Sequence, residues 1–311
     1  MIDFKIVQIQ TISACNASCK ICPHRISWMR TPEGTGYMDD DLYIKILQDI
    51  VKNDPLFDAR FCPYLANEPF CDKKIVERIR IAYDYLPDME LEVSTNAELM
   101  DEARMKQMIN IITSRNTNPK TKIKISFFGY DKESLEDMMH INYEKTLHNI
   151  INLIKYNNGR VPIVITGLGL SRDEKVKIYN ASKYKRFWAR VIDEHNLSRK
   201  NLRIQYYSFH NRAGTVELDG WDYNTIVRKI DRNHPFDCWR LHNTLHVLWN
   251  GDLTLCCMSP YRHEAIFGNL KHQTIKEAFE SEEWKRLYNQ ARGLEPSPPD
   301  FICKRCMSPG G

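Results

Sequence analysis

The sequence lacks the long apolar segments that place a protein in a membrane. No apolar run in its 311 residues approaches the ~20 residues that a membrane-spanning helix needs. The N-terminal stretch MIDFKIVQIQ has neither the cationic start nor the apolar core of a secretory signal peptide. We therefore expect a cytoplasmic protein, in which ten cysteines indicate metal or redox chemistry rather than disulfides.

A strong charge imbalance and a basic tract are also lacking. The net charge is only +4, and the richest basic stretch, Lys183 to Arg190, mixes charge with aromatic residues as a solvated helix face does. These features argue against a nucleic-acid partner. No internal repeat or low-complexity segment occurs, and 42% hydrophobic with 27% charged residues is the composition of an ordinary globular protein.

The sequence does contain a regular alternation of strand-like and helix-like segments over residues 1–214. Strand-like runs lie at 4–12, 59–65, 91–95, 123–128, 161–166 and 202–209. Helix-like runs lie at 39–53, 73–85, 101–112, 143–157 and 172–195. The alternation predicts a parallel α/β sheet, either doubly wound or closed toward a barrel, with its chemistry at the carboxyl ends of the strands.

The character of the chain changes near its end. Residues 215–235 are polar and contain glycine and proline, which indicates a linker. In residues 236–311, two short apolar runs joined by Asn250-Gly251 predict a hairpin, and one helix is expected from Ile275 to Ala291. Because this part has five cysteines but little apolar sequence, we predict a small domain held together by metal.

Three cysteines, Cys15, Cys19 and Cys22, lie in the stretch CNASCKICPHR with the spacing C-x3-C-x2-C. A structural zinc site needs four ligands, so this cluster lacks one. Three interpretations are open: free thiols in a loop, a zinc site completed by His24, or an iron–sulfur cluster. A [4Fe–4S] cluster held by three thiolates keeps one iron open for another ligand.

The order of strand, cysteine motif and helix resembles the start of the radical S-adenosylmethionine (radical SAM) enzymes. CNASCKIC is similar to their CxxxCxxC signature, including the apolar Ile21 before the last cysteine. At the end of the second strand, Asn67-Glu68-Pro69 resembles the family's GGE(P) motif, with Ala66 and Asn67 in place of the two glycines. At the end of the third strand, Ser94-Thr95-Asn96 resembles the ribose-contacting TNG stretch, with Ala97 for glycine.

Two further segments lie at the ends of the fourth and fifth predicted strands. KISFFGYDKESLEDM, which contains Ser126, is similar to the family's iSfdG…e segment. GLGLSRDE (167–174) is the nearest stretch to the GxIxGxxE motif and leaves the adenine contacts unassigned. The resemblance implies SAM contacts from Glu68, Pro69, Ser94, Thr95, Asn96 and Ser126.

The same resemblance implies a fold and a chemistry. It implies a partial (β/α)6 barrel over residues 1–214 with a [4Fe–4S] cluster on the three N-terminal cysteines. In this family the open iron is chelated by the amino and carboxylate groups of SAM. One electron then cleaves SAM to a 5′-deoxyadenosyl radical, which abstracts a hydrogen atom from the substrate. A reductant such as flavodoxin or ferredoxin is an implied partner.

A second and complete set of cysteines lies in the C-terminal part, at Cys238, Cys256, Cys303 and Cys306. By counting alone, this set suits Zn(Cys)4 and a fully ligated [4Fe–4S] cluster equally well. The tail resembles the SPASM/twitch domain of radical SAM enzymes, including FGNL at 267–270, which implies one auxiliary [4Fe–4S] cluster. We expect Cys257 to follow Cys256 on the second hairpin strand, to point to the opposite face, and not to be a ligand.

Three further residues are candidates for chemistry on the substrate. An epimerase needs a hydrogen-atom donor, and Cys71 is the spare thiol near the expected active face, although free cysteines are commonly small core hydrophobes. A dehydrogenase needs a base for a substrate hydroxyl, and His210 and Arg212 close the sixth strand. The alternative for both is an ordinary loop that leads into the linker.

The sequence therefore predicts a radical SAM enzyme of the oxidoreductase type. Its net reaction is oxidation or dehydrogenation, epimerisation or cross-linking of a small metabolite, a sugar-like compound or a peptide. A peptide-modifying maturase of ribosomal peptides is the alternative within this class. The alternative from another class is a zinc-stapled binding protein without catalysis.

Overall fold

One curved sheet organises the protein. The computed structural model describes residues 4–25, 36–169, 181–208, 211–216, 238–258, 260 and 263–306. Within them, nine strands run in the order β6-β5-β4-β3-β2-β1-β7-β8-β9. Their bounds are β1 Ile6–Ile9, β2 Arg60–Cys62, β3 Glu90–Thr95, β4 Lys122–Ser126, β5 Ile163–Gly169, β6 Leu202–Ser208, β7 Thr244–Val247, β8 Asp252–Thr254 and β9 Ile266–Asn269. β1 to β6 are parallel, as predicted, whereas β8 is antiparallel to both of its neighbours.

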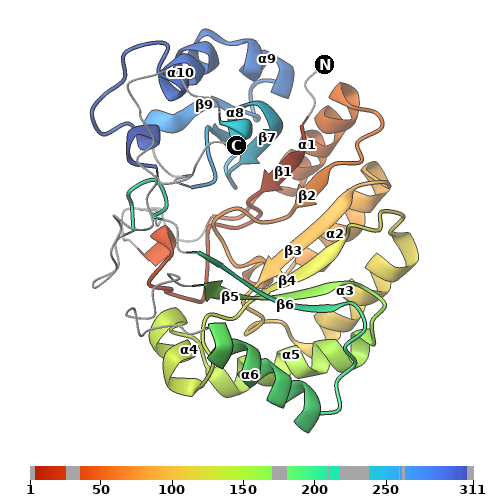
Figure 1. Ribbon diagram of the computed structural model, residues 1–311. Helices are drawn as coiled ribbons and strands as arrows, with labels where there is room; N and C mark the ends of the chain where they lie inside the picture. The colour runs from red at the N-terminus through yellow and green to blue at the C-terminus, as the bar shows by residue number, and fades with distance from the viewer. Residues whose placement is uncertain are drawn as a thin grey trace.

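Helices connect the strands and lie along one face of the sheet. Figure 1 shows α2, α3, α5 and α6 along the same side of β1 to β6. In the described part of the chain, the α-helices are α1 Asp40–Asn53, α2 Ile75–Tyr85, α3 Glu102–Arg115, α4 Lys132–Met139, α5 Tyr143–Asn157, α6 Ala181–Glu194, α8 Trp239–Asn243, α9 Ile275–Glu280 and α10 Glu282–Arg292. Single 3-10 turns are η1 Pro23–Arg25, η3 Pro69–Cys71, η4 His263–Ala265 and η5 Ile302–Arg305.

Local sequence explains where these helices begin. The Asp39 side chain caps α1, because it accepts hydrogen bonds from the backbone N–H groups of Asp41 and Leu42. The helix therefore begins one residue after its predicted start. Asp131 caps α4 in the same way and forms a reciprocal capping box with Ser134. Each cap satisfies donors that the first helical turn leaves without an intrahelical partner.

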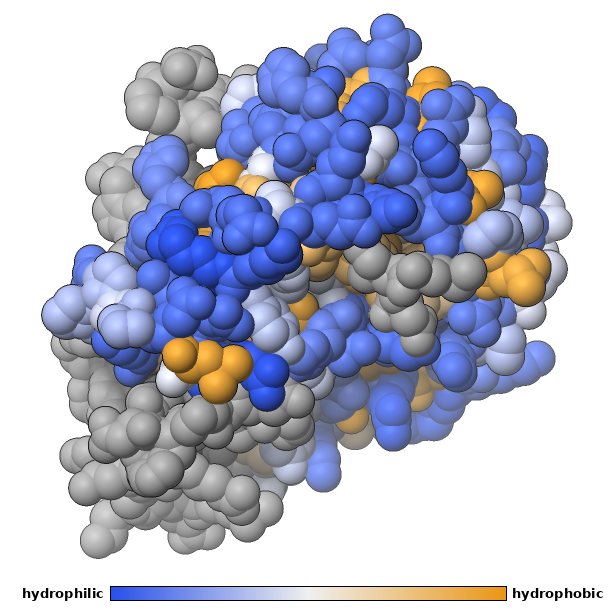
Figure 2. All heavy atoms as spheres, turned by 90° about the horizontal axis from the view of Figure 1, so that it is seen from above, coloured by the Kyte–Doolittle hydropathy of each residue, from blue (hydrophilic) through white to orange (hydrophobic). Residues whose placement is uncertain are grey.

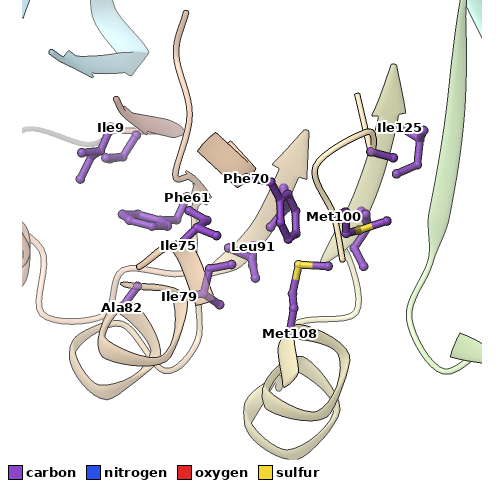
Figure 3. Packing of buried hydrophobic residues seen from close by; sticks show 14 of the residues in the cluster. Ile9, Phe61, Phe70, Ile75, Ile79, Ala82, Leu91, Met100, Met108 and Ile125 are labelled. Atoms are coloured by element: carbon purple, nitrogen blue, oxygen red, sulfur yellow. The ribbon is translucent and has the colours of Figure 1, made fainter. Parts of the chain in front are cut away.

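The apolar core lies between the sheet and these helices. Figure 3 shows Phe61 and Leu91, on β2 and β3, facing Ile79 of α2, with Met108 of α3 beside them. All four side chains are fully buried. Burial of each stabilises the fold by about 1.5–3 kcal/mol, before the entropy of ordering is subtracted.

The opposite face of the sheet is polar. Along β4, Ile123 and Ile125 are buried, whereas Lys122, Lys124 and Ser126 are only partly buried and project from the other side. Because successive strand residues alternate in direction, the apolar set packs on the helices and the polar set faces the barrel interior. The sheet therefore presents charged and hydroxyl groups to its hollow side.

The C-terminal part is joined to the same sheet. β7 pairs with β1 in parallel, so that Val7 lies opposite Leu245. The ring of Phe4 contacts the ring of Phe279 at a centroid distance of 5.2 Å, and the N–H of Ile275 donates to Asp49 Oδ2 at 2.5 Å. Only residues 215 and 216 of the expected linker are described, and the domain limits stay a prediction.

Among the described residues, four elements differ from the sequence-based expectation. The helix expected over 275–291 is two helices, because Ser281 is extended (φ −67°, ψ 154°) and its side chain accepts from the N–H of Trp284, which starts α10. The short helices α4 and α8 and the strand β9 were not predicted. Asn250-Gly251 does connect β7 to β8, and Gly251 has the positive φ (90°) that favours glycine there.

Polar residues dominate the face of the molecule seen in Figure 2, where apolar residues occur mostly singly. Large exposed apolar side chains are few among the described residues: Tyr37, Leu56, Tyr206 and Leu294. No helix in the described ranges has the length and apolar character needed to cross a membrane.

Candidate functional site

The loop that carries Cys15, Cys19 and Cys22 follows β1 and is held by backbone hydrogen bonds on both sides. The N–H of Glu68 donates to the carbonyl of Ala14 at 3.0 Å. The N–H of Ser18 donates to the carbonyl of Met139 at 3.1 Å, at the end of α4. The helix that the sequence did not predict is thus part of the support for the cysteine loop.

A cavity of about 500 Å³ opens at the carboxyl ends of the parallel strands. It brings together most of the side chains that the sequence analysis selected from distant motifs. The predicted residues that line it are Cys15, Cys19, Cys22, Glu68, Ser94, Thr95, Asn96, Ser126 and Arg212. His24 lines it as well. Their roles as ligands stay predictions, but their convergence on one cavity follows from the parallel sheet.

Two of the N-terminal thiols, those of Cys15 and Cys19, are in surroundings that oppose their ionisation. Burial raises the pKa of Cys15 and of Cys19, and neighbouring negative groups, Glu68 among them, raise it further. The positive charge of a bound metal centre would stabilise the thiolate form of these cysteines, and their protons would be released on binding. Within the described ranges, no three Cys, His, Asp or Glu side chains are gathered closely enough to hold a single metal ion.

Glu68 is buried beside these thiols and is held by three donors. Its Oε1 accepts from the Phe70 N–H at 3.1 Å and from the Thr95 hydroxyl at 2.5 Å, and its Oε2 accepts from the Asn96 N–H at 2.8 Å. Burial raises the pKa of Glu68 to about 7, against the effect of these hydrogen bonds. The carboxylate therefore joins the ends of β2 and β3 and lies in the cavity wall.

Side chains around Glu68 extend this network to the cysteine loop. Asn96 Nδ2 donates to Asn16 Oδ1 at 2.9 Å, and Asn16 Nδ2 donates to Glu98 Oε2 at 2.5 Å. Ala97, where the family has glycine, adopts a left-handed conformation (φ 67°), which costs about 1–2 kcal/mol in a residue with a Cβ. The turn after β3 is thus fixed in spite of strain.

The residues that line this cavity fit a [4Fe–4S] cluster whose open iron binds a polar ligand. The donor set is three thiols on one loop, with Glu68 and Asn96 on the same cavity wall. The buried Nδ2 atom of Asn67, also in this wall, has no hydrogen-bond partner among the described residues. An amide donor left in this state is suited to an anionic or carbonyl group of a bound molecule.

The C-terminal cysteines lie on separate short elements. Cys238 directly precedes α8, Cys303 is in η5, and Cys306 directly follows η5. Cys256 is close enough to Cys303 for their charges to interact, and its pKa is raised first by a hydrogen bond with the Cys257 thiol and then by burial. All four predicted auxiliary ligands pack partly buried against the core.

The prediction that Cys257 lies on the second hairpin strand, with its side chain on the face opposite to that of Cys256, was wrong. β8 ends at Thr254, so Cys256 and Cys257 follow the strand in a turn, and the alternation of a strand does not separate their side chains. The hydrogen bond with Cys256, and then the guanidinium groups of Arg240 and Arg212, lower the pKa of Cys257. Cys257 lines the main cavity, which brings the C-terminal part to the site.

Two residues predicted for this site, Pro69 and Cys71, are not among the described residues that line the cavity. Pro69 and Cys71 form η3 behind Glu68, and burial followed by Glu68 raises the pKa of Cys71 to about 11. His210 lies outside the described residues. Arg212 does line the cavity; it has a left-handed backbone (φ 49°), and its Nη1 contacts Met258 Sδ at 3.6 Å.

Sequence reasoning missed several residues of this cavity. Lys124 and Thr166 project inward from β4 and β5, Gln8 projects from β1, and Arg240 reaches the cavity from α8. For Lys124 a signal existed, because it shares a strand face with the selected Ser126 two residues later. For Arg240 no local signal existed, because only the pairing of β7 with β1 brings α8 to the barrel.

The fold and the C-terminal part together define a class. Residues 238–307 match the family model of the SPASM domain, an iron–sulfur cluster-binding domain. The described residues have the fold of BtrN and of anSMEcpe, both solved with AdoMet bound, a partial barrel followed by the C-terminal part. The resemblance drawn from the sequence and the predicted fold class are thereby confirmed.

Individual relatives are distant. Over 167 residues, the chain is 24% identical to the S-adenosyl-L-methionine-dependent 2-deoxy-scyllo-inosamine dehydrogenase of Niallia circulans. The aligned region covers 50% of this chain and 65% of that protein, slightly less than two thirds of its length. BtrN, solved in complex with AdoMet and 2-DOIA, superposes with a TM-score of 0.60 at 16% identity, over 99% of this chain and 95% of BtrN. Streptococcus suis SuiB bound to its precursor peptide SuiA gives 0.64 at 12% identity, over 92% of this chain and 67% of SuiB.

Proposed function

We propose that this chain is a radical SAM dehydrogenase that oxidises a hydroxyl-bearing small molecule. The observation that carries the proposal is the single cavity in which Cys15, Cys19 and Cys22 meet Glu68 and Asn96. It is supported by the fold shared with BtrN along nearly the whole of both chains, and by the dehydrogenase relative.

Each cysteine set has its own part in this proposal. The three N-terminal thiols hold a [4Fe–4S] cluster, and Glu68 with the Ser94–Asn96 stretch and Ser126 holds SAM beside it. Cys238, Cys256, Cys303 and Cys306 hold the auxiliary cluster. When bound, these groups supply the radical that removes a hydrogen atom from the substrate and the acceptor for its remaining electron.

The chain's own residues position the substrate and shield it. Arg212, in the turn after β6, donates hydrogen bonds to the substrate oxygen and stabilises negative charge on it when the hydroxyl proton passes to solvent. The apolar side chains of Phe128, Met139 and Met258 line the same cavity and exclude water from the reacting carbon. A flavodoxin or ferredoxin supplies the electron that starts the cycle.

Deuterium transfer tests this function. The anaerobically reconstituted protein is given SAM, a reductant and candidate alcohols labelled with deuterium at the carbon that bears the hydroxyl. We expect deuterium in 5′-deoxyadenosine and a ketone product. Zinc without iron in the purified protein would support the non-catalytic alternative and contradict the proposal.

Peptide modification is the second candidate, because SuiB with its precursor peptide has the same fold. Label transfer from peptides alone, with none from small alcohols, would replace the proposed substrate class by this one.

A further inference from the structure

Asn16 lies between Cys15 and Cys19 in the cysteine loop, but it is not among the described residues that line the main cavity. Its half-buried side chain is hydrogen-bonded at both ends of the amide. Its Oδ1 accepts from Asn96 Nδ2 at 2.9 Å, and its Nδ2 donates to Glu98 Oε2 at 2.5 Å. One amide therefore joins the loop that carries the N-terminal thiols to the turn that follows β3.

A single carboxylate fixes which way these amides face. An ionised carboxylate only accepts hydrogen bonds, so the nitrogen of Asn16 must face Glu98 and its oxygen must face Asn96. The nitrogen of Asn96 then faces Asn16, and its oxygen accepts from the backbone N–H of Glu98 at 2.9 Å. Neither amide can turn over without placing two donors or two acceptors against each other. The orientation of both amides thus follows from the carboxylate of Glu98.

Glu98 is held on its other side by α5. Its Oε1 accepts from the backbone N–H of Asn142, the N-cap residue of that helix, at 3.2 Å. Asn149 of the same helix donates from Nδ2 to the backbone carbonyl of Glu98 at 3.0 Å. The dipole of a helix also favours a negative charge at its N-terminus. The acceptor that fixes Asn16 is therefore anchored to a regular element of the barrel.

Asn96 carries the same chain of contacts into the cavity wall. It lines the main cavity, and its backbone N–H donates to Glu68 Oε2 at 2.8 Å. Asn16 and Glu98 lie behind this wall, since neither is among the described residues that line the cavity. The two side chains thus connect the wall proposed to bind SAM with the loop proposed to hold the cluster, without contacting the space between them.

We propose that Asn16 and Glu98 are positioning residues that hold the cysteine loop in a fixed place against the wall formed by Asn96 and Glu68. This inference rests on the proposed function only in placing a [4Fe–4S] cluster on the three N-terminal thiols and SAM beside it. Retention of the cluster and affinity for SAM then depend on the same pair of side chains, because the proposed SAM site includes both the loop and the wall.

Exchange of the two groups tests the pair. In Asn16→Asp, a second carboxylate faces that of Glu98, and the two repel each other. In the double variant Asn16→Asp/Glu98→Gln, the amide at position 98 donates to the carboxylate at position 16, which still accepts from Asn96. The oxygen of the same amide accepts from the N–H of Asn142. Every hydrogen bond of the chain is thereby restored, with one of them reversed, and the net charge of the pair is unchanged.

The readouts are the iron content after anaerobic reconstitution and the SAM affinity of the reconstituted holoenzyme in equilibrium dialysis. We expect Asn16→Asp to lower the iron content from about eight toward about four atoms per chain. We expect its SAM affinity to fall about tenfold. The double variant should return both values to within about twofold of the wild type. No recovery in the double variant, or wild-type values in Asn16→Asp, overturns the proposal.

Lys20→Gln is the matched control. Lys20 is in the same loop, and its Nζ lies 2.5 Å from Asp137 Oδ1 in an exposed pair. Because such pairs contribute little, we expect wild-type iron content and SAM affinity in this variant. A loss as large as that in Asn16→Asp would overturn the specific role of Asn16. If Asn16→Asp does not fold, Glu98→Gln replaces it, since one amide oxygen cannot accept from both Asn16 and the N–H of Asn142.

These readouts separate the inference from the proposed function, because neither requires a substrate. Wild-type iron and SAM binding without label transfer from any alcohol contradicts the dehydrogenase and leaves the positioning pair in place. Unchanged iron in Cys19→Ala contradicts the N-terminal cluster and overturns both proposals. Loss of iron in Cys19→Ala, with wild-type values in Asn16→Asp, overturns the positioning pair alone.

Discussion

The hydroxyl of Thr95 donates a hydrogen bond of 2.5 Å to Oε1 of Glu68, although the two residues are 27 positions apart in the chain. The same hydroxyl oxygen accepts the N–H of Ala97 at 2.9 Å, so one buried atom joins the strained turn after β3 to the carboxylate of the cavity wall. This contact gives the site a rigid side against which a ligand can bind.

Replacement of Thr95 by valine keeps the shape of the side chain and removes both hydrogen bonds. We expect a loss of about 1–3 kcal/mol in the free energy of unfolding, since buried polar groups are left without partners. SAM affinity, measured by equilibrium dialysis, should fall as well. Thr117→Val is the control, because the Thr117 hydroxyl is exposed. Equal stability of the two variants in urea unfolding would refute the role of Thr95.

Replacement of Cys19 by alanine tests the N-terminal cluster. After anaerobic reconstitution we expect iron to fall from about eight to about four atoms per chain, because only the auxiliary cluster remains. Formation of 5′-deoxyadenosine should be lost. Cys62→Ala is the matched control, since Cys62 is a buried thiol on β2 that is not among the residues lining the main cavity. Unchanged iron in Cys19→Ala would exclude this thiol as a ligand.

His246 makes stability depend on pH. Burial, and then the charge of Arg240, lowers its pKa from 6.5 to about 3. As the pH falls, His246 is therefore protonated first in the unfolded chain. The stability that the neutral His246 contributes to the folded protein is fully present above about pH 6.5 and is lost progressively below it. Between pH 7 and pH 5 we expect the wild type to lose about 2 kcal/mol more than His246→Gln in chemical unfolding.

The control for this measurement is His148→Gln on the exposed side of α5. That variant should follow the wild type across the same pH range. Parallel pH profiles for the wild type and His246→Gln would show that His246 does not carry this dependence.

Arg78 and Asp72 form a buried ion pair that supports η3 from behind. Arg78 Nε donates to Asp72 Oδ2 at 2.9 Å, and both side chains are almost fully buried. In Arg78→Met the carboxylate of Asp72 stays buried without its charged partner, and we expect a loss of about 3–5 kcal/mol. Arg80→Met, which breaks exposed pairs on the same helix, should leave the urea midpoint nearly unchanged. A similar shift in both variants would contradict this reasoning.

Much of the fold was predictable because its signals are local. The alternation of β-branched strands with amphipathic helices specified six parallel strands, and Asn250-Gly251 specified the turn between β7 and β8. Where local signals are weak, prediction failed. The cap at Ser281 divides a continuous amphipathic pattern into α9 and α10, and the length of β8 decides that Cys257 is not on a strand.

The candidate site was predictable only in part. The residues with recognisable motifs, such as Glu68 and the N-terminal cysteines, were found because each motif ends a strand, and the ends of parallel strands meet. Cys71 was placed near the active face by its sequence distance from Glu68, but η3 keeps it out of the cavity lining among the described residues.

The sequence by itself determined which thiols and polar strand ends this protein has, because spacing and residue type are written in the chain. Only the tertiary structure decided which of them share a cavity and what charge surrounds them. Arg240 is more than a hundred residues from Lys124 and reaches the same cavity because β7 pairs with β1. Electrostatic interactions depend on distance in space, and the folded sheet alone sets that distance.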